Sequence, residues 1–333
     1  MNKVNNGNGL EMAYLDEGHS DDVILLLHGF PELAYSWRRV IPALVQAGYR
    51  VIAPDQRGYG ETTGWPSGYD VDLAPYSFKN LVADALGLLN ALNIPSVVVV
   101  VGHDFGSPVA AWAAMTRPEV FPRLVLMSAP FGVSTTNVFD AVARLEPARD
   151  HYHQYYATPT ADRDMRDPPQ GLHDFLRGYF HYKSGDHVAN RTRPLTEYEL
   201  GSLPTYYVME AGKTMPETVL DEMPAEPSNW LTDDELATYC REYRRTGFQG
   251  GLNWYRARIA GVDSAERSTI RVPTAFIAGK HDWGVYQSPG TFESMQSTIC
   301  SDMRGVHLVD GAGHWVQQEQ PKTTSTLLLD FLA

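Results

Sequence analysis

Short, uninterrupted apolar runs alternate with segments of helical periodicity along the first 130 or so residues of the chain. After a short start that indicates antiparallel strands, strand patterns occupy residues 23–32, 49–55, 97–101 and 123–132. SWRRVIPALVQAG and FKNLVADALGLLNALN, which lie between them, have the period of amphipathic helices. Continuous apolar runs of this length are typical of parallel strands covered on both faces. The alternation therefore predicts an α/β fold with a mostly parallel, doubly wound sheet.

The pattern then changes for about 130 residues. Aromatic-rich helical segments such as LHDFLRGYFHY and DELATYCREYRRTGFQGGLNWYRA replace the strands, and proline-containing connections join them. Strand patterns return at 272–283 and 305–315, before a closing helix in TTSTLLLDFL. We predict a helical cap, residues 133–262, inserted into a core formed by residues 1–132 and 263–333.

The strand pattern at 97–101 runs into the turn Gly-His-Asp-Phe-Gly, and an alanine-rich helical pattern follows at once. Gly102 and Gly106 bracket this turn, so that residue 104 is exposed above the strand end. Such a strand, turn and helix form the nucleophile elbow of an α/β-hydrolase fold, here with Asp104 in place of the usual serine. Asp104 could equally cap the following helix, because Asp is a good N-cap.

A carboxylate at the elbow changes the expected chemistry. Attack by serine on an sp3 carbon would leave an ether, which is a dead end. A carboxylate is ionised near neutral pH, and its attack on an sp3 carbon gives an alkyl ester that water can hydrolyse. The elbow therefore predicts an epoxide or an alkyl halide as the substrate class.

The tetrapeptide HGFP follows the strand pattern at 23–27. Pro31 disfavours helix in the residue before it and predicts a sharp turn, with a cis Phe30–Pro31 bond. Because both strand ends meet at one edge of a parallel sheet, we expect the amides of Phe30 and Phe105 to form an oxyanion hole. The alternative is an ordinary strand-to-helix turn.

Hydrolysis of an ester needs a base, and His314, in DGAGHW beyond the last strand pattern, has the position of the base in this fold. Asp282, in AGKHDWG after the preceding strand, is the expected acid that orients the histidine. Asp310 is the nearest alternative, but it belongs to the same strand end as His314.

Opening an epoxide also needs an acid for the departing oxygen, and a tyrosine is protonated at neutral pH. The chain has 18 tyrosines, so any one of them is more often a packing residue. The pattern by itself leaves six candidates in the predicted cap: Tyr152, Tyr155, Tyr156, Tyr179, Tyr182 and Tyr255.

HGFPE with SWRRVIPAL, QAGYRVIAPDQRGYGE, GHDFG, GLNWYR and GAGHW together resemble the epoxide hydrolase family, and most of all the hydrolase domain of mammalian soluble epoxide hydrolases. In that family two cap tyrosines polarise the epoxide oxygen. The NWYR motif implies Tyr255 as one of them, and HYHQYYATP implies Tyr152 as the other. AGKHDWG is one residue longer than the usual spacing, which affects the register of Asp282.

The resemblance and the residues together predict an epoxide hydrolase acting on a small apolar epoxide and water. The aromatics Trp230, Phe248 and Trp254 indicate an apolar pocket, and we expect Pro31, His103 and Trp254 to contact the substrate.

Three alternatives use the same fold. A haloalkane or haloacid dehalogenase needs halide-binding donors beside the turn, where this chain has Phe30 and Phe105. An ester or lactone hydrolase would carry serine at the elbow. A small-ligand-binding protein without catalysis would not need a complete set of nucleophile, acid, base and tyrosines.

Composition narrows the partners. The net charge of -13, without a lysine or arginine cluster, argues against nucleic acid. Cys240 and Cys300 are too few for a disulfide framework or a zinc site, and the histidines lack ligand spacing, so we expect no metal and no cofactor. With no secretory pattern and no apolar run of about 20 residues, we expect a cytoplasmic protein without a membrane span. The oligomeric state stays open.

Overall fold

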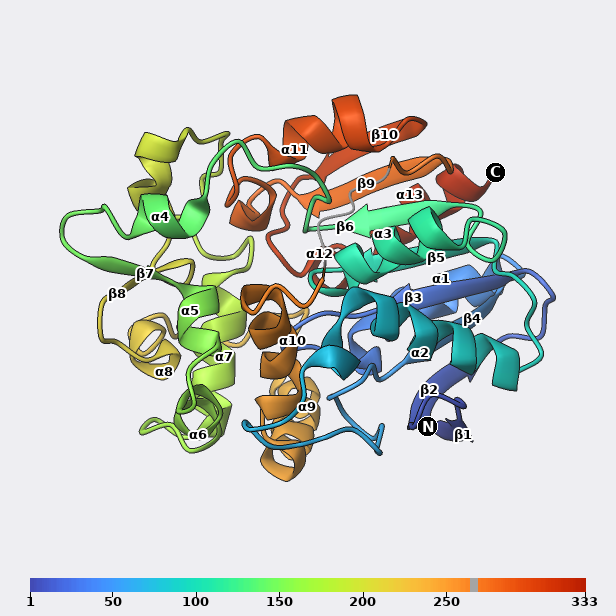
Figure 1. Cartoon of the computed structure of the whole chain (residues 1–333), viewed down its shortest axis with the longest axis horizontal. Coiled ribbons are helices and arrows are strands. Elements are labelled where there is room, and N and C mark those ends of the chain that lie inside the picture. Colours follow the sequence, from blue (N-terminus) through green and yellow to red (C-terminus); the bar gives the residue numbers. More distant parts are fainter. Residues whose placement is uncertain (264–268) are drawn as a thin grey trace.

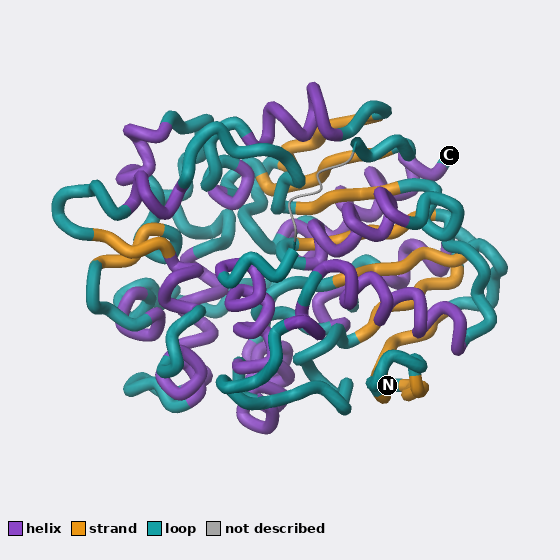
Figure 2. Tube along the Cα trace, in the orientation of Figure 1, coloured by secondary structure: helices purple, strands orange, loops and turns teal. Residues whose placement is uncertain are grey.

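A central sheet of eight strands organises the fold (Figures 1 and 2). The computed structural model describes residues 1–263 and 269–333. The strand order is β1-β2-β4-β3-β5-β6-β9-β10, with antiparallel pairing from β1 to β4 and parallel pairing from β4 to β10. The strands are β1 (Asn2–Asn5), β2 (Glu11–Glu17), β3 (Val23–Leu27), β4 (Arg50–Pro54), β5 (Val99–His103), β6 (Leu124–Met127), β9 (Thr274–Gly279) and β10 (Met303–Val309). The predicted mostly parallel sheet with an antiparallel start is confirmed.

Helices cover both faces of this sheet. Figure 1 shows α2 and α3 in front of it and α1 and α13 behind it. The helical elements of the core are η1 (Ala34–Trp37), α1 (Ile41–Gln46), η2 (Ala74–Tyr76), α2 (Phe78–Ala91), α3 (Gly106–Thr116), η4 (Trp283–Val285), α11 (Thr291–Ser294), the π turn η5 (Met295–Ile299), α12 (Val316–Glu319) and α13 (Pro321–Leu332). Along β3, Leu25 and Leu27 face the α2–α3 side, whereas Ile24 and Leu26 face the α1–α13 side. Burial on both faces explains why the strand reads as a continuous apolar run.

Between β6 and β9 the chain forms a group of helices beside one end of the sheet (Figure 1). These elements are α4 (Val138–Val142), β7 (Arg149–His151), α5 (Tyr152–Tyr156), α6 (Ala161–Arg166), α7 (Leu172–Tyr182), η3 (Glu197–Ser202), β8 (Val208–Glu210), α8 (Met215–Thr218), α9 (Asp233–Thr246) and α10 (Gln249–Ile259). The expectation of no strands here was wrong, since β7 and β8 pair antiparallel. Strands of three residues are too short to show a period. The predicted boundary at 262–263 adjoins residues 264–268, which lie outside the described residues.

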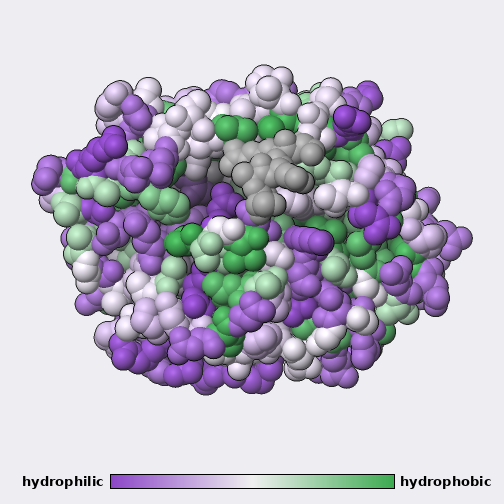
Figure 3. Space-filling view, viewed as in Figure 1, coloured by the Kyte–Doolittle hydropathy of each residue, from purple (hydrophilic) through white to green (hydrophobic). Residues whose placement is uncertain are grey.

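The surface viewed in Figure 3 is mostly hydrophilic, with apolar side chains in small patches, one of them over α10. None of the helices that the structure describes has the length and hydropathy needed to cross a membrane.

A polar cluster around Glu235 of α9 joins the predicted cap to the core. Its carboxylate accepts hydrogen bonds from Arg38 Nε at 2.9 Å, Arg39 Nη2 at 3.0 Å and Thr232 N at 2.9 Å. Burial raises the pKa of Glu235, but the hydrogen bonds from Arg38 and Thr232 outweigh it and lower the pKa to about 2. Because this pKa lies below its unfolded value, the cluster stabilises the fold at neutral pH and loses that effect as the pH falls.

We predict that Glu235→Gln lowers the free energy of unfolding by about 1 kcal/mol at pH 7, a value reduced by the partial exposure of the pair. The difference from the parent protein should narrow as the pH falls from about 4.5 to about 2. Urea denaturation at a series of pH values measures this. Glu119→Gln, which breaks the exposed Arg117–Glu119 pair, is the control and should change little. A difference independent of pH would contradict the assignment.

Candidate active site

The turn between β5 and α3 has the backbone that the elbow requires. Asp104 has a φ of 50°, in the left-handed region that side chains rarely adopt. A Cβ on Gly102 would lie 2.1 Å from the Gly106 carbonyl oxygen, and one on Gly106 would lie 2.3 Å from the carbonyl oxygen of Leu27. The two glycines therefore let the turn pack against β3 and lift Asp104 above the strand end.

Asp104 does not cap α3. The N-cap of this helix is Phe105, and no side chain caps it. The carboxylate of Asp104 instead accepts a hydrogen bond from Phe30 N at 2.8 Å through Oδ1, and its Oδ2 lies 3.1 Å from His314 Nε2. Burial raises the pKa of Asp104, but the hydrogen bond and charge of His314 hold it well below its usual range. The group is an ionised carboxylate beside an imidazole.

His314 lies between two carboxylates. Its Nδ1 is 3.1 Å and 3.2 Å from the oxygens of Asp282, which in turn accept a hydrogen bond from Gly284 N at 2.7 Å. Burial and the charge of Lys183 lower the pKa of His314, yet Asp282 and Asp104 raise it more, so that the net shift is upward. The alternative acid, Asp310, is exposed and pairs with the Lys280 ammonium at 2.7 Å. The structure thus brings Asp282, and not Asp310, to the histidine.

The HGFP turn meets the elbow at the same edge of the sheet. The Phe30–Pro31 peptide is cis, as the sequence predicted, and Pro31 is buried in the turn. A Cβ on Gly29 would lie 2.3 Å from Asp104 Oδ1 and 2.6 Å from Phe105 N, which shows how closely the two turns approach. Of the predicted pair of amides, Phe30 N–H donates to the carboxylate, and Phe105 N–H lies next to it.

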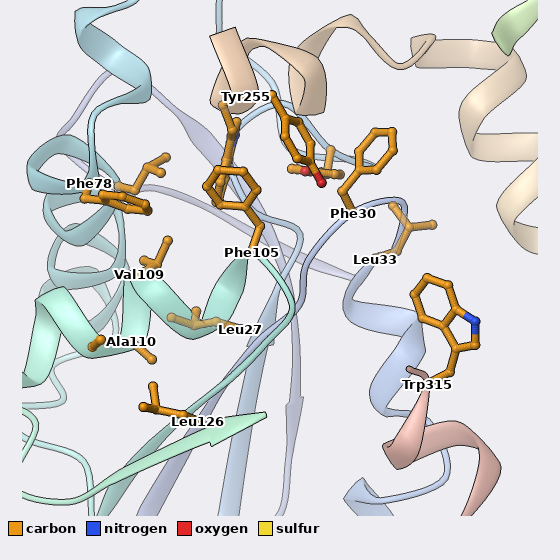
Figure 4. Packing of buried hydrophobic residues seen from close by; sticks show 14 of the residues in the cluster. Leu27, Phe30, Leu33, Phe78, Phe105, Val109, Ala110, Leu126, Tyr255 and Trp315 are labelled. Carbon is orange, nitrogen blue, oxygen red and sulfur yellow. The ribbon is translucent and has the colours of Figure 1, made fainter. Parts of the chain in front are cut away.

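The structure places both tyrosines implied by the resemblance over the elbow. Tyr255 of α10 lies with its ring 5.5 Å from that of Phe30 and 4.8 Å from that of Phe105, and Figure 4 shows it descending between them. Tyr152, at the start of α5, has its ring 6.1 Å from that of Tyr255. Burial and then the charge of Asp104 raise the pKa of both hydroxyls well above the ordinary value, so both remain proton donors.

Other tyrosine candidates bond within the predicted cap. Tyr156 donates its hydroxyl to that of Tyr179 at 3.0 Å, and the Tyr182 hydroxyl pairs with Thr205 Oγ1 at 3.1 Å. Tyr155 lies on the same short helix as Tyr152, but it packs at the edge of the core cluster and is only partly buried. Of the six candidates, Tyr152 and Tyr255 lie over the elbow, whereas the hydroxyls of Tyr156, Tyr179 and Tyr182 are bonded to other side chains.

Two predicted substrate contacts, His103 and Trp254, have their ring nitrogens bonded within the protein. His103 is completely buried, and its Nδ1 and Nε2 lie 2.5 Å from Glu32 Oε2 and 2.7 Å from the His314 carbonyl oxygen. With both ring nitrogens engaged, His103 positions His314 and does not offer a group to substrate. Trp254 donates its indole N–H to the Arg57 carbonyl at 2.9 Å and packs edge-on against Phe105.

Sequence reasoning missed two buried acids that hold the histidine loop. Glu32, which directly follows HGFP, accepts hydrogen bonds from the side-chain amides of Gln317 and Gln318 in addition to its contact with His103. Glu319 accepts hydrogen bonds from the backbone N–H groups on both sides of His314. For Glu32, a charged residue directly after an apolar run was the available signal, whereas Glu319 lies in a polar stretch that gives none.

Glu319 ties the histidine loop to the predicted cap. Its carboxylate accepts hydrogen bonds from Gly313 N at 3.0 Å and Trp315 N at 2.9 Å, which flank the base, and from Gly185 N at 2.7 Å in the segment after α7. The loop is therefore fixed from both domains of the predicted organisation.

Among the residues described, no group of three or more His, Cys, Asp and Glu side chains is arranged to hold a metal ion.

Comparison with known proteins agrees with this geometry. The sequence model of the alpha/beta hydrolase fold family matches residues 22–321. Epoxide hydrolase A of Mycobacterium tuberculosis is 34% identical over 98% of this chain and 95% of its own, and epoxide hydrolase B of the same organism is 33% identical over 93% and 91%. The chain belongs to the epoxide hydrolase family of the α/β-hydrolase fold. The bifunctional epoxide hydrolase 2 of Sus scrofa is also related, at 29% identity over 97% of this chain and 53% of the pig protein.

Solved structures of epoxide hydrolases superpose over nearly the whole chain. Epoxide hydrolase A from Mycobacterium thermoresistibile matches with a TM-score of 0.81 and 33% identity, covering 99% of this chain and 97% of that one. Potato (Solanum tuberosum) epoxide hydrolase I matches with a TM-score of 0.78 and 30% identity, covering 98% and 96%. With coverage of 98% and 99% of this chain, these overlaps include the segments between β6 and β9.

We predict that Asp282→Asn lowers the pKa of His314 by about 1 unit or more, because it removes a buried negative charge that favours the imidazolium. Asp310→Asn is the matched control and should leave that pKa unchanged, since Asp310 is exposed and paired elsewhere. Titration of the His314 ring signals by NMR measures both. Equal shifts in the two variants would show that Asp282 is not the orienting acid.

Proposed function

We propose that the protein hydrolyses an epoxide to a vicinal diol through a covalent ester on Asp104. The observation that carries this proposal is the environment of the ionised Asp104 carboxylate. One of its oxygens accepts the Phe30 N–H, and the other lies beside His314 Nε2. Two protonated tyrosines lie above it. A nucleophile that needs no deprotonation and acids that face it suit an electrophile with a poor leaving group. The names of the related proteins support the same substrate class.

In the first step, Asp104 attacks a carbon of the epoxide. Oδ1 is held by Phe30 N–H, so Oδ2 is the attacking atom, and Oδ1 becomes the ester carbonyl oxygen. The carbon–oxygen bond of the ring breaks as the new bond forms. The oxygen released takes a proton from Tyr152 or Tyr255, whose raised pKa values make each a donor that is readily protonated again.

In the second step, His314 takes a proton from water, and the hydroxide formed attacks the carbonyl carbon of the Asp104 ester. Asp282 stabilises the imidazolium that results. Negative charge then develops on Oδ1, which already accepts the Phe30 N–H, and the neighbouring Phe105 N–H completes the oxyanion hole. Collapse breaks the bond between Cγ and Oδ2. The departing alkoxide takes the proton of the new carboxyl group, and the His314 imidazolium returns its proton to the tyrosinate left by the first step. The diol is released, and one oxygen of water stays in Asp104.

The substrate class favoured is a small apolar epoxide. The rings of Phe30, Phe105, Tyr152 and Tyr255 surround the nucleophile.

A dehalogenase on this fold needs donors for the departing halide. The indole N–H groups of Trp254 and Trp315 both donate to backbone carbonyls, and neither serves that purpose.

We predict the fate of oxygen in a single turnover with excess enzyme in heavy-oxygen water. The label should enter the carboxylate of Asp104 and be absent from the diol, because the diol takes its second oxygen from Oδ2. Mass spectrometry of the peptide that contains Asp104 and of the diol measures this. Label in the first-turnover diol would overturn the covalent route. The control variant, Asp104→Asn, should form no ester. If the parent protein released halide from haloalkanes but formed no diol from styrene oxide, a dehalogenase would be favoured.

We predict that Tyr255→Phe slows formation of the ester by about 100-fold, at the lower end expected for loss of a general acid because Tyr152 remains. Hydrolysis of the ester should change much less, since the proton donor acts on the epoxide oxygen. Rapid-quench measurement of both half-reactions separates them. Tyr198→Phe removes the hydroxyl of a side chain that is 87% exposed and should leave both rates unchanged. A slower second step with a normal first step would contradict the assignment.

A further inference from the structure

A lysine ammonium is buried beside the candidate active site. Lys183, at the C-terminal end of α7, is 3% exposed. Its Nζ lies 5.3–5.7 Å from the centroids of four aromatic rings, which come from three segments of the chain: Tyr179, Tyr206, Tyr207 and Trp315. Aromatic faces attract a cation, and they partly replace the water that it loses. Burial of an ammonium is otherwise costly, so this position is an unusual one for lysine.

The backbone of Lys183 is fastened to the loop of the histidine. Its carbonyl oxygen accepts a hydrogen bond from His314 N at 2.9 Å. A Cβ on Gly313 would come within 2.4 Å of the Ser184 carbonyl carbon, so the two segments are in direct contact. The cage residue Trp315 follows His314 directly, and the two rings lie 4.6 Å apart. These contacts hold the ammonium at a constant position relative to the base.

The charge of Lys183 acts on both members of the site. After burial, Lys183 is the largest influence that lowers the pKa of His314. It also lowers the pKa of Asp104, after the larger opposing effect of burial and the contribution of His314. The cation therefore opposes a charged imidazole and favours an ionised nucleophile.

The other titratable groups around His314 come from every element that packs against it. Asp104 faces Nε2 from the elbow, Asp282 faces Nδ1 from the end of β9, and His103 of β5 has its ring 5.2 Å away. Glu319 lies behind the loop, and burial raises its pKa to about 8. When the ester forms, Asp104 loses its charge, and the charges of Lys183 and Asp282 then act on the pKa of the imidazole in opposite directions.

We propose that Lys183 is a positioning residue for the second step, because its caged ammonium keeps the His314 imidazole neutral and able to take a proton from water once Asp104 is esterified. The assignment rests on the proposed function. Without the cation, Asp282 would favour the imidazolium, which has no site for that proton. Lys183 thereby extends hydrolysis of the ester to lower pH.

The direct test is the titration of His314 by NMR in Asp104→Asn, whose uncharged amide stands in for the ester. Adding Lys183→Met should raise the pKa of His314 by about 1 unit, as expected for loss of a charge at this range. Lys183→Arg keeps the charge and should restore the lower value. Lys213→Met removes an exposed lysine that pairs with Glu210 and is the matched control, with no shift expected. A change of the His314 signals near pH 8 that is the same in every variant would report the ionisation of Glu319, whose pKa is about 8, and not that of His314.

The kinetic test uses the parent nucleophile. In Lys183→Met the acid limb for decay of the ester should move up by about one pH unit, which slows decay about tenfold below the limb and leaves the plateau at high pH unchanged. A residue needed only for packing would lower the rate equally at every pH. That result, or an unchanged His314 titration, overturns the proposal.

Lys183→Gln is the second variant if Lys183→Met does not fold. Failure of both to fold would also overturn the proposal, because the charge would then serve the fold. Thermal unfolding and circular dichroism identify this outcome. If the parent protein forms no ester on Asp104, the proposed function fails, whereas the titration of His314 still decides what Lys183 does.

Discussion

The site depends on one backbone constraint, the left-handed conformation of Asp104 in a turn that has no room for side chains at its flanks. Three stretches of backbone approach one another closely at this turn. A Cβ on Gly29, Gly102 or Gly106 would overlap atoms of a neighbouring stretch. That approach puts the carboxylate against Phe30 N–H, and the sheet edge presents it to His314. A side chain at Gly29 would overlap Asp104 and Phe105 N, whereas one at Gly102 or Gly106 would overlap the backbone of the elbow or of the end of β3.

Charge is arranged around this point so that Asp104 and the two tyrosines each keep one protonation state. Asp104 is held ionised by the neighbouring imidazole, although burial opposes it. The tyrosines above it are held protonated by burial and by the charge of Asp104 itself. His314 is left as the group able to change state, because Asp282 and Lys183 act on its pKa in opposite directions. The proposed nucleophile, two acids and base thus keep different protonation states within a few side chains of one another.

The core and the segments between β6 and β9 contribute different parts of this chemistry. The strand ends of the core supply the proposed nucleophile, orienting acid and base. The helices α5 and α10 supply Tyr152 and Tyr255, and the segment after α7 supplies Lys183. Glu319 connects the two by accepting N–H groups from both.

The sequence by itself determined the parallel sheet, the elbow at Asp104 and the strand-end positions of Asp282 and His314, because apolar runs and glycine-flanked turns are local signals. It could not choose Asp282 over Asp310 by contact, exclude Asp104 as a helix cap, or show that His103 is fully engaged, since these depend on partners 30 to 211 residues away. The aromatic cage around Lys183 is of the same kind. Only tertiary structure brings four rings from three segments around one ammonium.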